Sequence, residues 1–364
     1  MIQNPTVAVS PYRQVLGKSL GIEGYPDKVV GSLLGCVCGD VLGAGLEKLT
    51  RQQIKAQYGR VNDFIDTPGR PSGFYTDDSE MTLALATSLV KSGRLDPEDC
   101  ARNYAEFFSR PPERGYGKAT KKILRALGKG ADYRSTGTLF LPAGSFANGG
   151  AMRISPVGLA FRNASDAELR KAVSEALLPT HVHPEGIDGA LIQAKAVGLL
   201  SLTSASYFEP SSLLTKLHSL AETEVMRDKL EIVQERLTAR PDHILNLLCT
   251  PVNGEVFQIH AAEAVSCALW CLAKYYKDPE EAIIQAVALG GDTDTIGALV
   301  GAMVGALYGT AWIPKRWFEN IENQPVTGRD VFIATGKALA KLDLCPAKKP
   351  LSIFPQIFHR LTHL

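Results

Sequence analysis

The stretch Gly290-Gly291-Asp292-Thr293-Asp294-Thr295 leads into an apolar run, 296–312, in which glycines recur at 297, 301, 305 and 309. A spacing of four places these glycines on one face of a helix, where a second helix can approach closely. Residues 28–47 repeat the pattern, with glycines at 31, 35, 39 and 43. Because each interior glycine costs a helix roughly 1 kcal/mol relative to alanine, two such sets need a packing reason. The sequence therefore predicts tightly packed buried helices, and the acids that precede 296–312 argue against a membrane span.

Helical periodicity continues along most of the chain, and convincing alternating strand patterns are absent. We expect an all-α fold, a compact single-domain orthogonal helix bundle over 28–345, with an irregular arm at 1–27 that ends near Pro26 and a tail at 346–364. The segment 129–158 is too irregular for a helix, and a loop of that length is usually functional. Further helices are expected at 77–92, 97–109, 117–128, 166–178, 186–203, 211–222, 225–239, 258–276, 279–288 and 328–342.

The composition is that of a soluble globular protein, with 364 residues of which 45% are hydrophobic and 21% charged. The net charge of +1 gives no sign of a nucleic-acid surface or a membrane patch, so we expect neither partner, and we expect a monomer. Seven cysteines without disulfide-like spacing indicate a reducing compartment, the cytoplasm or the nucleus. Residues 1–22 lack acids but hold few basic residues, which leaves a mitochondrial location open.

Two acidic clusters stand at the starts of predicted helices: Thr76-Asp77-Asp78 and the stretch from Asp292 to Thr295. Their carboxylates and hydroxyls are hard oxygen ligands, which suit Mg²⁺, Mn²⁺ or Ca²⁺ and suit zinc poorly. Helix capping is the alternative explanation, since Thr and Asp cap helices and acids in a first turn are favoured by the helix dipole. However, carboxylates that alternate beside a glycine pair repel each other unless a positive charge neutralises them. We predict that the two clusters meet around metal ions.

The first glycine-rich helix closes with two acids, Asp40 and Glu47. Glu47 follows glycines that loosen the helix end, so its side chain can swing, and it is our candidate for proton transfer. The alternative is an ordinary exposed glutamate, although the dipole disfavours an acid at a helix C-terminus. Asp40 lies in mid-helix, and we expect it to hold structure or a water molecule.

The loop 140–153 combines small residues with two aromatic residues, Phe140 and Phe146. Its clustered glycines allow backbone N–H groups to approach a diphosphate, and the aromatic rings offer stacking surfaces for a base. A buried turn plugged by aromatic side chains is the alternative. The turn Arg114-Gly115-Tyr116-Gly117 is a second flexible segment of the same kind. His181 has two interpretations, a ligand contact or a hydrogen-bonded structural residue.

Taken together, these strings resemble the ADP-ribosylglycohydrolase family, all-α dimagnesium enzymes that release ADP-ribose from proteins. Within it, the RGYG turn and the SFANGGAMR loop look most like the ADP-ribosyl-serine hydrolase branch, which also cleaves poly(ADP-ribose). The matching pieces run in the family's order and span about residues 28–310: Gly35 to Glu47, Tyr75 to Asp78, Arg114 to Gly117, Asn148 to Arg153, Thr180-His181 and Gly290 to Thr295.

The resemblance implies two Mg²⁺ ions, with Mn²⁺ as a substitute, and ADP-ribosylated proteins or ADP-ribose as partners. It implies Glu47 as the catalytic residue. The implied metal ligands are Thr76, Asp77, Asp78, Asp292, Asp294 and Thr295. The implied substrate-binding residues are Gly115, Tyr116, Gly117, Phe140, Ser145, Phe146, Asn148, Gly149, Gly150 and His181.

The expected reaction is attack of water at the anomeric carbon of the distal ribose, with O-linked serine favoured and poly(ADP-ribose) or O-acetyl-ADP-ribose as further candidates. Hydrolysis of ADP-ribosylarginine is one alternative, and a non-catalytic ADP-ribose-binding protein is another. Phe146 stands where the serine-specific branch has tyrosine, and Ala147 where it often has glycine. Both differences bear on substrate preference.

Overall fold

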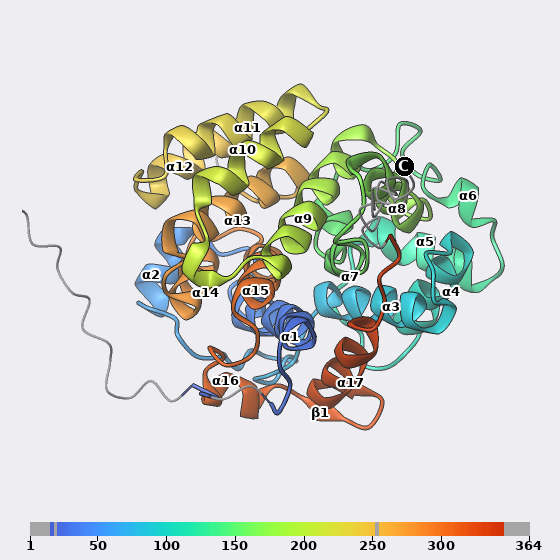
Figure 1. Cartoon of the computed structure of the whole chain (residues 1–364), viewed down its shortest axis with the longest axis horizontal. Coiled ribbons are helices and arrows are strands. Elements are labelled where there is room, and N and C mark those ends of the chain that lie inside the picture. The colour runs from blue at the N-terminus through green and yellow to red at the C-terminus, as the bar shows by residue number, and fades with distance from the viewer. Residues whose placement is uncertain (1–14, 18–19, 252–254, 346–364) are drawn as a thin grey trace, which may run out of the picture.

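Two central helices, α1 (Tyr25–Ala44) and α15 (Thr293–Tyr308), lie side by side in a computed structural model that describes residues 15–17, 20–251 and 255–345 (Figure 1). Their glycines face each other: a Cβ on Gly35 would overlap the carbonyl oxygen of Gly301, and a Cβ on Gly301 would overlap that of Gly35. The helices run antiparallel, since Gly31 meets Gly305 and Gly309 at one end, and Gly43 meets Thr293 at the other. The predicted close packing is confirmed.

This pairing brings the end of α1 to the start of α15. The hydroxyl of Thr293 donates to the carbonyl of Gly43 at 2.8 Å. Beyond α1, the N–H of Lys48 donates to Gly291 at 2.9 Å, and the N–H of Gly291 donates to Leu49 at 2.8 Å. The turn that carries Glu47 is therefore tied by its backbone to the glycine pair that opens the second acidic cluster.

Helix α3 (Asp77–Ser92) is fixed to α1 through a buried carboxylate. Asp40 accepts the backbone N–H of Thr76 at 3.0 Å and that of Ser79 at 3.0 Å. Asp40 is fully buried, so these bonds supply the partners that its carboxylate would otherwise lack. The bonds agree with the structural role expected for Asp40, and they place the first acidic cluster beside α1.

The remaining elements surround this centre, with α10, α11 and α12 on one side and α3, α4 and α5 on another (Figure 1). They are α2 (Arg51–Gln57), α4 (Pro97–Phe108), α5 (Lys118–Gly128), α6 (Tyr133–Thr136), η1 (Asn148–Gly150), α7 (Ser155–Ala160), α8 (Asp166–Leu177), α9 (Pro184–Leu202), η2 (Ala205–Tyr207), α10 (Pro210–Leu220), α11 (Glu224–Glu235), α12 (Pro241–Leu248), α13 (Ala261–Tyr275), α14 (Pro279–Val287), α16 (Lys315–Asn320), β1 (Asn323–Gln324), β2 (Thr327–Gly328) and α17 (Arg329–Leu339).

The all-α prediction is confirmed, with a two-stranded antiparallel pair, β1 and β2, as a small addition. Sequence periodicity missed α2, α6, α7, α12 and α16, because helices of four to eight residues hold too few turns to show a pattern. The segment 129–158, expected to be too irregular for a helix, thus contains α6 and the start of α7. The position of Pro26 was interpreted wrongly: it lies in the first turn of α1, where its missing N–H costs nothing. The division at 27 and 345 stays a prediction, and most of the arm and the tail lie outside the described residues.

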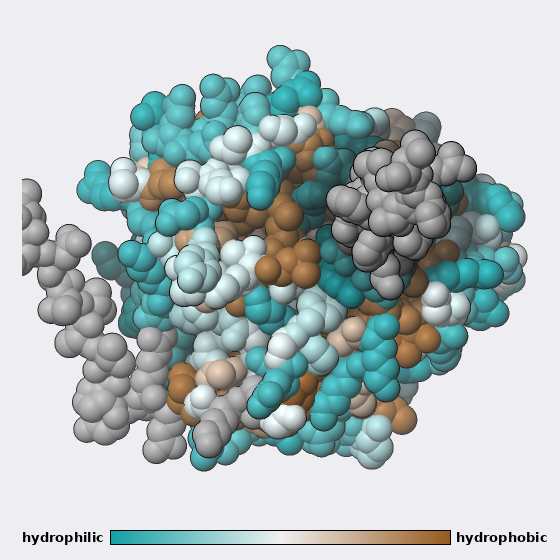
Figure 2. All heavy atoms as spheres, in the orientation of Figure 1, coloured by the Kyte–Doolittle hydropathy of each residue, from teal (hydrophilic) through white to brown (hydrophobic). Residues whose placement is uncertain are grey.

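The apolar run 296–312 is a buried helix in its main part, since α15 is covered along almost its whole length. Among the described residues no helix is both long enough and apolar enough to cross a membrane. All seven cysteines are free, and six of them are buried. On the face shown in Figure 2 the surface is mainly hydrophilic, and apolar residues reach it in limited areas.

Candidate active site

The two acidic clusters and Glu47 come together where α1, α3 and α15 meet, and we call Glu47, Asp77, Asp78, Asp292 and Asp294 the acidic centre. Burial, and after it the charge of neighbouring carboxylates, raises the pKa of Asp78 and that of Asp294 well above the usual range. The charge of Asp292 acts on both, and that of Glu47 acts on Asp294. Such effects require proximity. The structure thus brings the sequence-predicted acids together.

Hydroxyl and amide groups complete the centre. The hydroxyl of Thr76 accepts the N–H of Asp78 at 3.3 Å, so the capping interpretation is correct for Thr76. Thr295 lies close enough to Asp78 and Asp292 for its side chain to lower the pKa of both carboxyls, which burial raises. Asn148 donates its side-chain amide to Asp292 at 2.6 Å. Threonines from both clusters therefore lie within the same group of oxygen atoms as the aspartates.

One oxygen atom of this centre has no partner. Asp78 Oδ1 is buried and accepts no hydrogen bond from the described residues. An unpaired buried carboxylate oxygen is costly, and several carboxylates that raise each other's pKa repel unless a cation neutralises them. The donor set consists of oxygen atoms alone, which fits a hard divalent cation such as Mg²⁺.

The side-chain positions do not form a finished coordination shell. Among the described residues, no group of three or more His, Cys, Asp or Glu side chains is arranged to hold a metal ion. A complete ligand set would have to combine the carboxylates with the hydroxyls of Thr76 and Thr295, or adjust when the ion binds. Ligation of metal by the six residues therefore remains a prediction, although all six lie where the two acidic clusters meet.

Glu47 lies in the turn after α1 rather than in the helix itself. Its side chain is 25% exposed, and it forms an ion pair with Lys48 at 3.0 Å. Lys48 has a φ of 73°, a left-handed conformation that non-glycine residues seldom adopt. The charge of Glu47 contributes to the raised pKa values of Asp77 and Asp292, which burial raises first. Glu47 is thus close to the acids and is also accessible from solvent.

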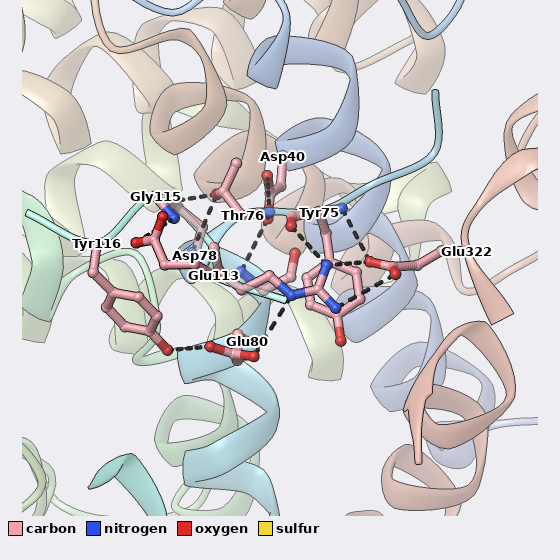
Figure 3. Close-up of polar contacts among 11 residues, drawn as sticks. Asp40, Tyr75, Thr76, Asp78, Glu80, Glu113, Gly115, Tyr116 and Glu322 are labelled. Carbon is pink, nitrogen blue, oxygen red and sulfur yellow. Dashed lines mark hydrogen bonds and ion pairs between the residues drawn. The ribbon is translucent and has the colours of Figure 1, made fainter. Parts of the chain in front are cut away.

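A group of polar and charged residues, among them Tyr75, Glu80 and Glu322, lies next to the first acidic cluster (Figure 3). The buried guanidinium of Arg114 donates to the carbonyl of Tyr75 at 3.0 Å, and the backbone carbonyl of Arg114 accepts the N–H of Asp77 at 3.0 Å. The guanidinium forms an ion pair with Glu322 and lies 3.6 Å from Glu80. Glu322 also accepts the N–H of Tyr75 at 3.3 Å. The backbone on both sides of Thr76 is therefore held by a charged network.

Sequence reasoning missed Glu322 and Gln258. Glu322 lies between α16 and β1, outside any recognisable motif. Gln258 accepts the N–H of Asp292 at 3.0 Å and donates to the carbonyl of Gly290 at 3.3 Å, so it fixes the turn before α15. Neither residue carries a local signal, because its importance comes from a partner far away in the sequence.

The turn 114–117 lies next to the acidic centre, but its tyrosine faces inward. A Cβ on Gly115 would be 3.9 Å from Asp77 Oδ1, which places the exposed Gly115 at the edge of the centre. Tyr116 is buried and donates its hydroxyl to Glu80 (Figure 3). Tyr116 could therefore contact a ligand only through its backbone. Gly117 is the N-cap of α5.

The glycine-rich loop reaches the centre through Asn148, and Gly149 packs on a histidine. A Cβ on Gly149 would be 3.1 Å from His181 Nε2, so a larger residue would press against the ring. His181 is buried, and its Nδ1 is 2.8 Å from the hydroxyl of Thr180. Burial, and after it the charge of Arg153, lowers the pKa of His181 to about 3, so this imidazole is neutral at pH 7.

The aromatic residues of the loop differ in their surroundings. Phe146 stacks on His260, with ring centroids 4.3 Å apart, and meets His183 edge to face. Phe140 is 42% exposed and has the ammonium of Lys122 5.2 Å from its ring centroid. Ser145 accepts the N–H of Ala147 at 3.2 Å. Phe146 therefore belongs to a preformed aromatic group in which His260 had not been predicted.

Comparison with known proteins gives one consistent result. The family model described as ADP-ribosylglycohydrolase matches residues 22–347. The ADP-ribosylhydrolase ARH3 of Homo sapiens is 31% identical over 327 residues, which cover 82% of this chain and 90% of that protein. The ADP-ribosylhydrolase ARH3 of Mus musculus is 29% identical over 80% of this chain and 86% of its own length. A solved "ADP-ribosylglycohydrolase-related protein complex" superposes with a TM-score of 0.68 at 28% identity and covers 88% of this chain and 99% of that one.

Proposed function

The chain belongs to the ADP-ribosylglycohydrolase family and is an ADP-ribosylhydrolase, and from this premise we propose that it uses Mg²⁺ to release ADP-ribose from O-linked serine. The observation that carries the proposal is the convergence of two oxygen-rich helix starts with Glu47. Poly(ADP-ribose) and O-acetyl-ADP-ribose share the oxygen linkage and are proposed as further substrates. The similarity to human and mouse ADP-ribosylhydrolase ARH3 supports the general activity.

Two Mg²⁺ ions would be held by Thr76, Asp77, Asp78, Asp292, Asp294 and Thr295, with Mn²⁺ as a substitute. When bound, they supply a positive charge that polarises oxygen atoms of water and of ribose hydroxyls. Support comes from the unpaired Asp78 Oδ1 and from the mutual repulsion of the acids.

Glu47 is proposed to manage the proton of the reaction. The glycosidic bond between the anomeric carbon and the serine oxygen breaks with oxocarbenium character, and water supplies the new oxygen. Glu47 accepts a proton from that water or donates one to the departing oxygen. Its position in a partly exposed turn beside Asp292 and Asp294 supports this role, because a proton-transfer group has to reach both the bond and the solvent.

The loop 145–150 is proposed to bind the rest of ADP-ribose. The backbone of Gly149 and Gly150 would approach the diphosphate, because glycine leaves the N–H groups uncovered. The neutral ring of His181 packs behind Gly149 and keeps this backbone in place. Phe146, already stacked on His260, offers a face to the adenine.

A side-by-side assay tests this function. Release of ADP-ribose is measured from serine-linked and arginine-linked peptides, with Mg²⁺ and with EDTA, for the unaltered protein and for Asp77→Asn. We expect release from the serine-linked peptide that is lost in EDTA and in Asp77→Asn. Asp132→Asn, which makes the same change at the exposed N-cap of α6 where Asn also caps, is the control. Full activity of Asp77→Asn in EDTA would refute the metal role. If the unaltered protein released ADP-ribose from neither peptide, the result would favour an ADP-ribose-binding protein.

A further inference from the structure

Arg70 places a positive charge at the edge of the acidic centre. It follows the turn 67–69, and its Nη1 donates to the carbonyl of Ala44, the last residue of α1, at 2.8 Å. On its other side, Arg70 Nη2 would be 3.2 Å from a Cβ on Gly115, the same Cβ that would be 3.9 Å from Asp77 Oδ1. The guanidinium therefore lies near both the end of α1, which the Glu47 turn follows, and Gly115, which stands beside Asp77.

Three other cations near this centre have carboxylate partners. Lys48 pairs with Glu47 at 3.0 Å, Arg114 pairs with Glu322, and Lys121 pairs with Glu113 at 2.7 Å. Within the described part of the chain, Arg70 makes no ion pair at 4.0 Å or less, and Glu113, the acid on which its charge acts, already pairs with Lys121. Arg70 is partly exposed, so its charge acts on whatever approaches this edge.

The position of Arg70 brings its charge close to the expected path of the leaving group. Glu47, as the proposed proton-transfer residue, has to face the bond that breaks. Arg70 is hydrogen-bonded to the carbonyl of Ala44, which directly precedes the turn that carries Glu47. Where Glu47 donates its proton to the departing oxygen, the modified side chain of the substrate leaves from the side that Glu47 faces. An arginine-linked substrate carries a guanidinium there, which a second guanidinium repels. A serine-linked substrate is neutral at that point, and in poly(ADP-ribose) the next unit brings a diphosphate, which a guanidinium attracts.

We propose that Arg70 is a specificity-determining residue that favours oxygen-linked leaving groups, neutral or anionic, over a cationic guanidinium. This inference rests on the proposed function and narrows its substrate class. It makes the neighbouring charge, rather than the metal ligands or Glu47, the reason why serine-linked ADP-ribose is preferred to arginine-linked ADP-ribose. Arg70 acts on the choice of substrate and takes no part in proton transfer.

The test compares kcat/KM for serine-linked and arginine-linked peptides in Arg70→Gln and Arg70→Lys. Arg70→Gln keeps a hydrogen-bond donor near Ala44 but removes the charge, so the serine-to-arginine preference should fall about tenfold, which corresponds to about 1.4 kcal/mol. Arg70→Lys keeps the charge and should keep the preference. Arg94→Gln is the matched control, since Arg94 lies beyond the opposite end of α3 and pairs with Asp96 at the surface. A merely structural role would lower the rates for both peptides equally.

An unchanged preference in Arg70→Gln would overturn the inference, as would a wild-type preference for the arginine-linked peptide. If Arg70→Gln does not fold, the wild-type preference is measured at rising salt concentration, which screens exposed charges. The preference should then fall, and a constant preference would again overturn the inference. Failure of the wild-type protein to cleave either peptide is a different result, because it refutes the proposed function itself.

Discussion

Replacement of Gly35 by alanine tests whether the close contact of α1 and α15 sets the architecture. The added Cβ would overlap the carbonyl oxygen of Gly301, a backbone atom that cannot rotate away. Overpacking of a rigid contact costs about 3 kcal/mol, at the upper end of its usual range. Alanine returns about 1 kcal/mol through its helix propensity. We therefore expect Gly35→Ala to lower the free energy of unfolding by about 2 kcal/mol.

Gly128→Ala is the matched control for this prediction. Gly128 ends α5, and a Cβ there would meet only the Cβ of Ala105, at 4.0 Å, an ordinary van der Waals contact. This variant should therefore be as stable as the wild type or more stable, by up to about 1 kcal/mol. Urea unfolding followed by far-UV circular dichroism measures both variants. If Gly35→Ala matched Gly128→Ala in stability, the interlocked glycines would not be the reason for the helix pairing.

Three further predictions concern single side chains. The native pKa of His181, about 3, lies below the usual 6.5, so the unfolded state binds a proton first and stability falls as the pH drops from 7. About 2 kcal/mol should be lost between pH 7 and pH 5, a loss that urea titrations of His181→Gln should no longer show. Glu47→Gln should retain binding of ADP-ribose while turnover falls at least about 10²-fold, and near-normal turnover would remove Glu47 from the mechanism. Glu322→Gln should weaken Mg²⁺ affinity about tenfold in a calorimetric titration, because Arg114 and the turn before Asp77 lose an anionic partner. Glu319→Gln, the same change at an exposed position of α16, should leave that affinity unchanged.

Much of the architecture could be predicted, because the information is local. The glycine spacing in 28–47 and 296–309 predicts close helix packing without information from the rest of the chain. Helices α1 and α15 form this contact. The capping role of Thr76 is likewise visible from a few neighbouring residues. Each acidic cluster could likewise be assigned to a helix start from its neighbouring residues. The hard oxygen ligands that the two clusters share then indicated that these helix starts approach each other.

The supporting residues could not be predicted, because their partners are distant in sequence. Glu322 holds Tyr75, and Gln258 holds Asp292, yet neither lies in a recognisable motif. The direction of Tyr116 was equally invisible, since a glycine-flanked tyrosine gives no indication that its hydroxyl turns inward to Glu80. The sequence identifies the groups that carry the chemistry more readily than the groups that hold them in place.

The buried, mutually repelling acids of the acidic centre should destabilise the protein when no metal ion is bound. Burial raises the pKa of Asp78 and that of Asp294, and the charge of Asp292 raises both further, a state that destabilises the fold unless a cation is present. A ligand that binds only the native state stabilises it in proportion to the logarithm of its concentration above the Kd. Divalent cations should therefore matter for stability as well as for turnover.

Titration calorimetry of the metal-free protein with Mg²⁺ tests the central claim most directly. The acidic centre should give a saturable binding signal in the wild type and in the control Asp132→Asn, and Asp294→Asn should lose it. Binding of Mg²⁺ by Asp294→Asn with the affinity of the wild type would contradict the account.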